Sequence, residues 1–201
     1  MTRLVRLHLA SRRVPAALAA LAGCAIVLWA ALHRHWDTYG ALQLPLLFET
    51  ACAGVVAITV ASPFGDPERA TGHRLPWLRM ATAVTLTGAA AAALAATGIG
   101  TDLAGGSATA VRNLAGLTGL GLLCAALLGG ALAWIAPVAY AMLGVYALYT
   151  QWHGPALTTP WIWPGRPGDD LGGALCAGLV LCAGLVTIAL RGARDAPPSA
   201  G

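Results

Sequence analysis

The chain has 201 residues, of which 58% are hydrophobic and only 10% are charged, whereas a typical soluble domain has about 25% charged residues. So few charged side chains cannot coat a soluble core of this size, which excludes an ordinary soluble globule and makes the lipid bilayer the expected surroundings. The net charge is +4, but the arginines lie at the edges of apolar runs and form no basic patch with interleaved aromatic residues. We therefore expect no nucleic-acid partner.

Six stretches of the chain are apolar enough to cross a bilayer as helices, a crossing that needs about 20 predominantly apolar residues. A basic N-terminal segment, residues 1–13, precedes the first stretch, and a tail, residues 191–201, follows the last. The sequence therefore predicts an all-α fold, a polytopic integral membrane bundle within residues 14–190. The six transmembrane helices are expected at about residues 14–32, 42–61, 80–99, 114–128, 131–149 and 171–190.

The fourth span has the least clear boundaries. Residues 114–149 form one apolar run, which is too long for one crossing and slightly short for two. The Gly129–Gly130 pair is the obvious hinge, and it divides the run into a short fourth span and a fifth span with Pro137 as a tolerated kink. Two alternatives stay open. The fourth span starts earlier and carries Arg112 and Asn113 into the interface, or it is re-entrant and the chain crosses five times.

The arginines predict the orientation of the bundle. If the N-terminus is cytoplasmic, nine of the twelve basic residues lie inside, and Arg34, Arg112 and Arg166 lie outside, in agreement with the positive-inside rule. A five-span chain would leave Arg191 and Arg194 on the outer side. We therefore expect six spans, both termini cytoplasmic, and a multi-pass protein of the plasma membrane.

Glu49 is the most unusual residue of the chain, because it is the acidic residue that lies deep in an apolar run. At 1.5 Å per residue it lies roughly 10 Å below the outer boundary of the second span, where a charge costs about 2.5–3.5 kcal/mol. Such a side chain must face protein or water. It is either a gating, proton-coupling or substrate-contact carboxylate or a structural carboxyl bonded to a neighbouring helix, and Arg112 is a candidate ionic partner.

The loop at residues 62–79 is the longest polar stretch on the predicted inner side. Pro63 and Gly65 break the second helix, and Asp66 can cap a short helix that starts at Pro67. A short charged helix held between two spans suits the docking of a partner protein. The alternative is an ordinary connecting loop that satisfies the positive-inside rule.

A segment rich in tryptophan and proline, residues 152–170, precedes the last span on the predicted outer side. It is either an external gate or lipid contact or an aromatic anchor, since tryptophan favours the membrane interface. Asp169 and Asp170 can cap the sixth helix. The candidate residues of the external aromatic segment are Trp152, His153, Trp161 and Trp163.

Several other classes of function find no support in the sequence. The five cysteines form no Cys-x-x-Cys pair, no predicted span contains a histidine, and no phosphate loop, nucleophile elbow or His-Glu-x-x-His motif is present. We therefore expect no metal site, no cofactor and no enzymatic activity. Pairs of small residues four apart allow close packing of helices in lipid; they are Gly88 with Ala92, Gly173 with Ala177, and Gly178 with Cys182.

The order of these features resembles the permease subunits of small bacterial ABC-type exporters. The resemblance implies that the loop between spans two and three contains a coupling helix that docks on a separate cytosolic ATPase subunit, and that residues 154–164 form a re-entrant external helix. It also implies a homo- or heterodimer. The loop sequence from Ser62 to Arg69 and the run 112–120 are similar to small actinobacterial membrane proteins associated with ABC transport. The residues implied in coupling are Asp66, Glu68, Arg69 and Arg74.

Two other functions stay open. The chain could be an accessory or structural membrane protein that transports nothing, in which case Glu49 is structural. It could also be a stand-alone proton-coupled carrier that uses Glu49. The substrate and the direction of transport are not predicted, because the helices are so uniformly rich in Ala, Leu and Gly that no pore-lining face is distinguishable.

Overall fold

The computed structural model describes residues 14–34, 38–60, 75–101, 103, 105–150 and 160–191, and within them the secondary structure is entirely helical. Six segments are long and apolar enough to cross a membrane, as predicted. The helices are α2 Val14–Leu32, α3 Thr38–Val60, α5 Leu75–Thr97, α6 Gly106–Leu128, η1 Gly130–Leu132, α7 Ile135–Thr150, η2 Trp163–Gly165 and α9 Leu171–Arg191, where η marks a short 3₁₀ helix.

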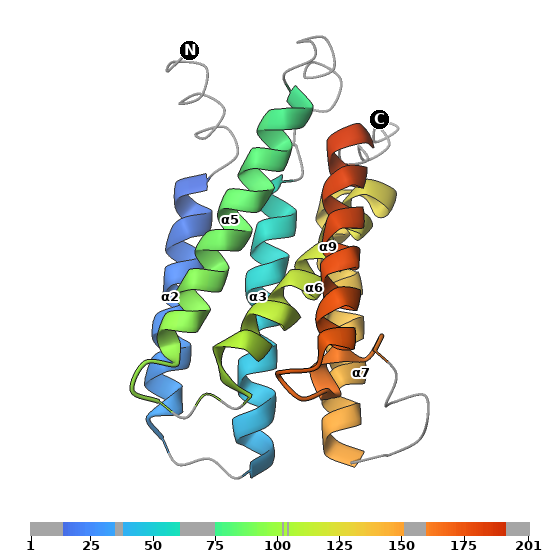
Figure 1. Ribbon diagram of the computed structural model, residues 1–201. Helices are drawn as coiled ribbons and strands as arrows, with labels where there is room; N and C mark the ends of the chain where they lie inside the picture. Colours follow the sequence, from blue (N-terminus) through green and yellow to red (C-terminus); the bar gives the residue numbers. More distant parts are fainter. Residues whose placement is uncertain are drawn as a thin grey trace, which may run out of the picture.

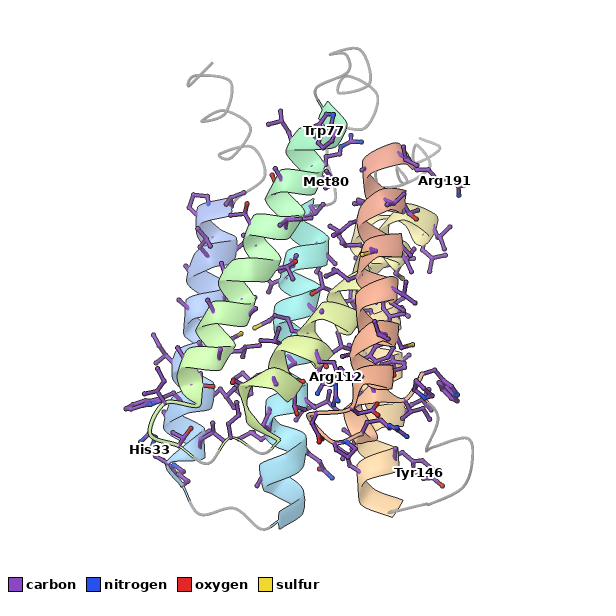
Figure 2. All side chains as sticks on the ribbon, viewed as in Figure 1. His33, Trp77, Met80, Arg112, Tyr146 and Arg191 are labelled. Atoms are coloured by element: carbon purple, nitrogen blue, oxygen red, sulfur yellow. The ribbon has the colours of Figure 1, made fainter. Side chains whose placement is uncertain are left out.

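The long helices run alternately up and down, so α2 begins and α9 ends at the same end of the bundle (Figure 1). Trp77, Met80 and Arg191 lie toward this end, which we call the Arg191 end (Figure 2). His33 and Tyr146 lie toward the other, the His33 end. The fourth helix, α6, is among the six that are long and apolar enough to cross, so the length and composition of the helices favour six spans over five.

The fourth helix differs from its predicted bounds, because α6 begins at Gly106 and not at Leu114. The predicted start at Leu114 was wrong, because Arg112 and Asn113 are polar but do not interrupt the helix, and the alternative of an earlier start is confirmed. Both side chains are buried inside the bundle, at 6% and 4% exposure, so they do not interrupt the helix. The predicted hinge is confirmed: α6 ends at Leu128 and is capped by Gly129, whose positive φ of 103° suits glycine.

Helix α6 is the central element of the bundle, with 13 of its 23 residues buried. Its backbone meets that of α9, because a Cβ atom added to Gly119 would lie 2.5 Å from the carbonyl oxygen of Val180. A Cβ on Gly184 would likewise lie 2.6 Å from the oxygen of Gly119. Small residues therefore bring these two helices into backbone contact, as they do in membrane bundles.

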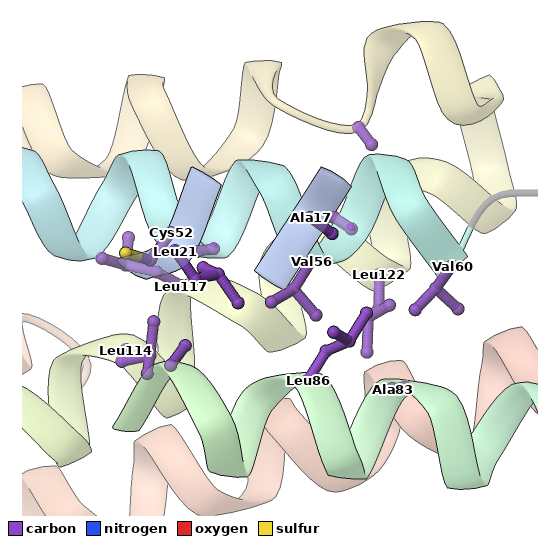
Figure 3. Close-up of a cluster of buried hydrophobic side chains, with 14 of the residues drawn as sticks. Ala17, Leu21, Cys52, Val56, Val60, Ala83, Leu86, Leu114, Leu117 and Leu122 are labelled. Carbon is purple, nitrogen blue, oxygen red and sulfur yellow. The ribbon is translucent and has the colours of Figure 1, made fainter. Parts of the chain in front are cut away.

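A cluster of aliphatic side chains fills the space between α2, α3, α5 and α6 (Figure 3). Leu21, Val56, Leu86, Leu117 and Leu122 are each no more than 2% exposed. Other large apolar side chains lie on the outside of the bundle, for example on α9, where Leu171, Leu175, Leu179 and Leu190 are 68–80% exposed. Burial of apolar residues inside and exposure of apolar residues outside together fit a lipid environment.

Candidate functional site

The segment between α7 and α9, residues 160–170, folds back against the His33 end of the bundle (Figure 1). We call it the returning segment. Trp163 is 2% exposed, and its ring lies so close to α6 that a Cβ on Gly116 would be 2.4 Å from it. The ring also stacks on Tyr140, with centroids 4.4 Å apart, and the Tyr140 hydroxyl donates a hydrogen bond to the carbonyl of Trp161. The buried Trp163 side chain thus anchors the returning segment in the bundle.

Arg112, on α6, fastens the other half of the returning segment. Its Nη1 donates to the carbonyl oxygen of Pro167 at 2.5 Å, and its Nη2 to that of Arg166 at 3.0 Å. The planar guanidinium is suited to this task, because it presents two parallel N–H groups to two successive carbonyls. Figure 2 shows Arg112 at the place where the segment meets the helices.

Asp170 links the segment to the start of α9. Its carboxylate forms a two-point ion pair with Arg166, at 2.7 and 3.0 Å, and accepts a hydrogen bond from the backbone N–H of Gly173 at 2.6 Å. The prediction that Asp170 caps the last helix is therefore confirmed. These bonds, with the ion pair first, lower the pKa of Asp170 to about 2.

The low pKa of Asp170 predicts how this link responds to acid. A carboxyl group whose pKa is depressed in the folded state stabilises that state above its ordinary pKa of about 4, and loses the contribution as pH falls toward the folded value. The thermal midpoint of the wild-type protein should therefore exceed that of Asp170→Asn by a constant margin from pH 7 to about 4. The margin should shrink between pH 4 and 2. A margin that is already lost at pH 5 would contradict this assignment.

Glu49, on α3, lies beside the same region and is 2% exposed. It accepts a hydrogen bond from the Asn113 side chain, and Arg112 is close enough to attract it electrostatically. The structure thus brings together Glu49 and Arg112, the two intramembrane polar candidates of the sequence. Among the described residues, Oε2 of Glu49 and Oδ1 of Asn113 are buried with no hydrogen-bond partner.

A cavity of about 260 Å³ lies between α3, α6 and the returning segment. One wall contains the polar side chains of Glu49, Asn113 and Thr109, and the opposite wall is the chain from Pro164 to Gly168. Thr109 is already bonded, because its hydroxyl donates to the carbonyl of Gly105 at 2.6 Å. The complete lining is Pro45, Leu46, Glu49, Gly105, Thr109, Asn113, Leu148, Pro164, Gly165, Arg166, Pro167 and Gly168.

The predicted external aromatic residues and the predicted coupling residues are described only in part. Trp161 is 48% exposed, whereas Trp163 is buried, so the external aromatic residues do not form one surface belt. Trp152 and His153 lie outside the described residues, and so does the predicted coupling group of Asp66, Glu68, Arg69 and Arg74.

Sequence reasoning missed two functional candidates. Asn113 was treated as an interfacial residue, although its position next to Arg112 at the start of an apolar run was a signal for a buried polar pair. Tyr140 carried no signal, because its partner Trp161 is far away in the sequence and the contact depends on how the segment folds back.

Comparison of the chain with family models, curated proteins and solved structures finds no significant match. The described residues contain no group of three or more His, Cys, Asp and Glu side chains that could hold a metal ion. The helices and the site together are those of a multi-pass membrane protein, all-helical where it is described, with a buried polar cluster beneath a returning segment.

Proposed function

We propose that this protein is the membrane-spanning permease subunit of an ABC-type exporter and that it works as a dimer with a separate cytosolic ATPase subunit. The observation that carries the proposal is the returning segment. A chain that turns back into the bundle just before the last span is the element expected at this position in such permeases. Ile162 and Trp163 are 3% and 2% exposed, so the segment is inserted and not merely laid across the helix ends.

The proposal also assigns an orientation in the plasma membrane. The Arg191 end faces the cytoplasm, because α2 and α5 begin there and α9 ends there, and nine of the twelve arginines lie in or beside the sequence segments that precede or follow these helix ends. The His33 end then faces outward, and the returning segment closes the outer side of the bundle. Coupling to an ATPase has to cross the distance between the two ends, and the continuous helices α3, α5 and α6 provide a rigid path for it.

In this proposal the polar cluster holds the outward side closed. Opening requires the returning segment to move away from α6, which breaks the two hydrogen bonds from Arg112 and unstacks Trp163 from Tyr140. A transporter needs two states of similar free energy. A few directional contacts of this kind make a gate that differential binding of substrate and nucleotide can shift.

Co-purification tests the proposal. The affinity-tagged protein, isolated from its native membrane, should recover an ATP-hydrolysing subunit, and the double variant Glu68→Ala with Arg69→Ala should recover at least about tenfold less, as expected for a loss of 1.4 kcal/mol in docking free energy. A matched control removes one acidic and one basic residue at the opposite end, Asp169→Ala with Arg34→Ala, and should leave recovery unchanged.

Two results would contradict the permease proposal. One is recovery of an ATPase that the Glu68 and Arg69 changes do not affect. The other is pH-dependent flux in proteoliposomes that contain no ATPase and that lose this flux on Glu49→Gln, because such flux defines a stand-alone proton-coupled carrier. An accessory role would be indicated by neither flux nor ATPase recovery.

A further inference from the structure

Two residues with a buried, unpartnered acceptor atom line one cavity at the His33 end. Glu49 and Asn113 both line the 260 Å³ space, both side chains are more than nine-tenths buried, and each has one oxygen without a hydrogen-bond partner. Buried polar atoms in folded proteins are nearly always bonded, so a pair of unpartnered acceptors on one wall points to a ligand that donates.

The hydrogen bond between Asn113 and Glu49 determines which of their polar atoms remain without a partner. The Asn113 amide nitrogen donates to the Glu49 carboxylate, so its oxygen, Oδ1, is the atom that remains. The free atom of Glu49 is likewise an oxygen, Oε2. The one hydroxyl of the wall, on Thr109, already donates to Gly105. The wall therefore presents acceptors and lacks a free donor.

The nearby cations do not occupy these acceptors. Both terminal nitrogens of Arg112 are bonded to the carbonyls of Pro167 and Arg166, and Arg112 does not line the cavity. The guanidinium of Arg166 is paired with Asp170 at 2.7 Å. Arg112 thus attracts Glu49 electrostatically, while Oε2 of Glu49 has no hydrogen-bond partner among the described residues.

We propose that this cavity binds a primary ammonium group, which donates N–H bonds to Oε2 of Glu49 and Oδ1 of Asn113. An ammonium has three N–H donors and a positive charge, so it satisfies both acceptors and complements the carboxylate. The space suffices, since a cavity of about 150 Å³ accepts benzene. The same chemistry belongs to a free amine and to the headgroup of an aminophospholipid. If the proposed function holds, the cavity is a substrate subsite, and amine binding itself does not depend on that function.

Binding of ethanolamine to the purified protein in phosphatidylcholine nanodiscs tests the site. Ethanolamine should raise the thermal midpoint in a saturable manner, whereas choline, which has the charge but no N–H donors, should not. Glu49→Gln should weaken ethanolamine binding at least about tenfold, since a charge-assisted bond becomes a neutral one. Thr59→Val is the matched control on α3, because that hydroxyl bonds to Val55 within its own helix and should leave binding unchanged.

A second variant keeps the test decisive if Glu49→Gln alters folding. Asn113→Leu removes the other acceptor, and it should also weaken ethanolamine binding while the protein elutes as a single species. Comparison of nanodiscs with and without phosphatidylethanolamine then identifies the source of the amine. Stabilisation by the lipid alone assigns a headgroup site, and stabilisation by free ethanolamine in phosphatidylcholine assigns a soluble amine.

Three outcomes would overturn the ammonium site: equal stabilisation by ethanolamine and choline, binding that neither variant weakens, or no stabilisation by either free ethanolamine or phosphatidylethanolamine. None of these measurements involves the ATPase. Recovery of an ATPase without amine binding would therefore reject the ammonium site and keep the permease proposal. Amine binding without recovery of an ATPase would keep the site and reject the permease proposal.

Discussion

Replacing Gly119 by alanine should lower the free energy of unfolding by about 3 kcal/mol, the upper part of the range for overpacked sites. The added Cβ would lie 2.5 Å from the oxygen of Val180 and 2.6 Å from the nitrogen of Leu181. These are backbone atoms of α9, so no side chain can rotate away, and the two helices must separate. Separation also disturbs Gly184, which contacts Gly119 in return.

The matched control is Gly178→Ala on α9, since no described atom lies within 4 Å of the added Cβ there. Alanine favours a helix over glycine by about 1 kcal/mol, so this variant should be as stable as the wild type or slightly more stable. Unfolding by SDS in mixed micelles measures both. Equal stability of the two variants would show that α6 and α9 are not in backbone contact.

The glycines also show where prediction from the sequence ends. Composition and segment length were sufficient for six helices, because each crossing depends on local apolar content. The spacing of small residues singled out Gly88, Gly173 and Gly178. Gly173 is buried beside Asp170 and Trp163, but Gly88 and Gly178 face open space among the described residues, and the backbone contact between helices is at Gly119 and Gly184. Which glycine packs depends on which helix lies opposite, and so many small residues make one sequence compatible with many pairings.

Only part of the polar site was predictable from the sequence, because local signals can be read there and long-range contacts cannot. Glu49 stood out because a carboxylate in an apolar run is costly wherever it lies, and that argument needs no tertiary structure. Its neighbours required the fold. Arg112 finds its hydrogen-bond partners about 54 residues away along the chain, and the returning segment brings them close only because Trp163 seats against Gly116. Local signals thus identify the costly residue, and long-range contacts decide what surrounds it.

Arg112→Met should have the largest effect of any single change at the site, a loss of about 3 kcal/mol in stability, because it removes two hydrogen bonds from a charged donor, each contributing about 1.5–3 kcal/mol. The carbonyls of Arg166 and Pro167 lose their donor, and Glu49 loses the electrostatic attraction of the guanidinium. Lysine should recover only part of this loss, because one ammonium cannot match two successive carbonyls as the planar guanidinium does.

Hydrogen exchange measured by mass spectrometry distinguishes release of the returning segment from general loss of stability. In Arg112→Met, the backbone amides of residues 160–170 should exchange faster than those of α2 and α5, because the segment loses its fastening to α6 while those helices keep their core. Arg34 is exposed and follows His33 in the chain, so Arg34→Met should change neither the exchange of the segment nor that of the helices. Adding Glu49→Gln to Arg112→Met should restore stability in part, since it removes the uncompensated carboxylate and the two effects are then not additive. Uniform acceleration of exchange across all helices would mean that Arg112 does not hold the returning segment. Full additivity of the two changes would mean that Arg112 does not interact with the Glu49 carboxyl group.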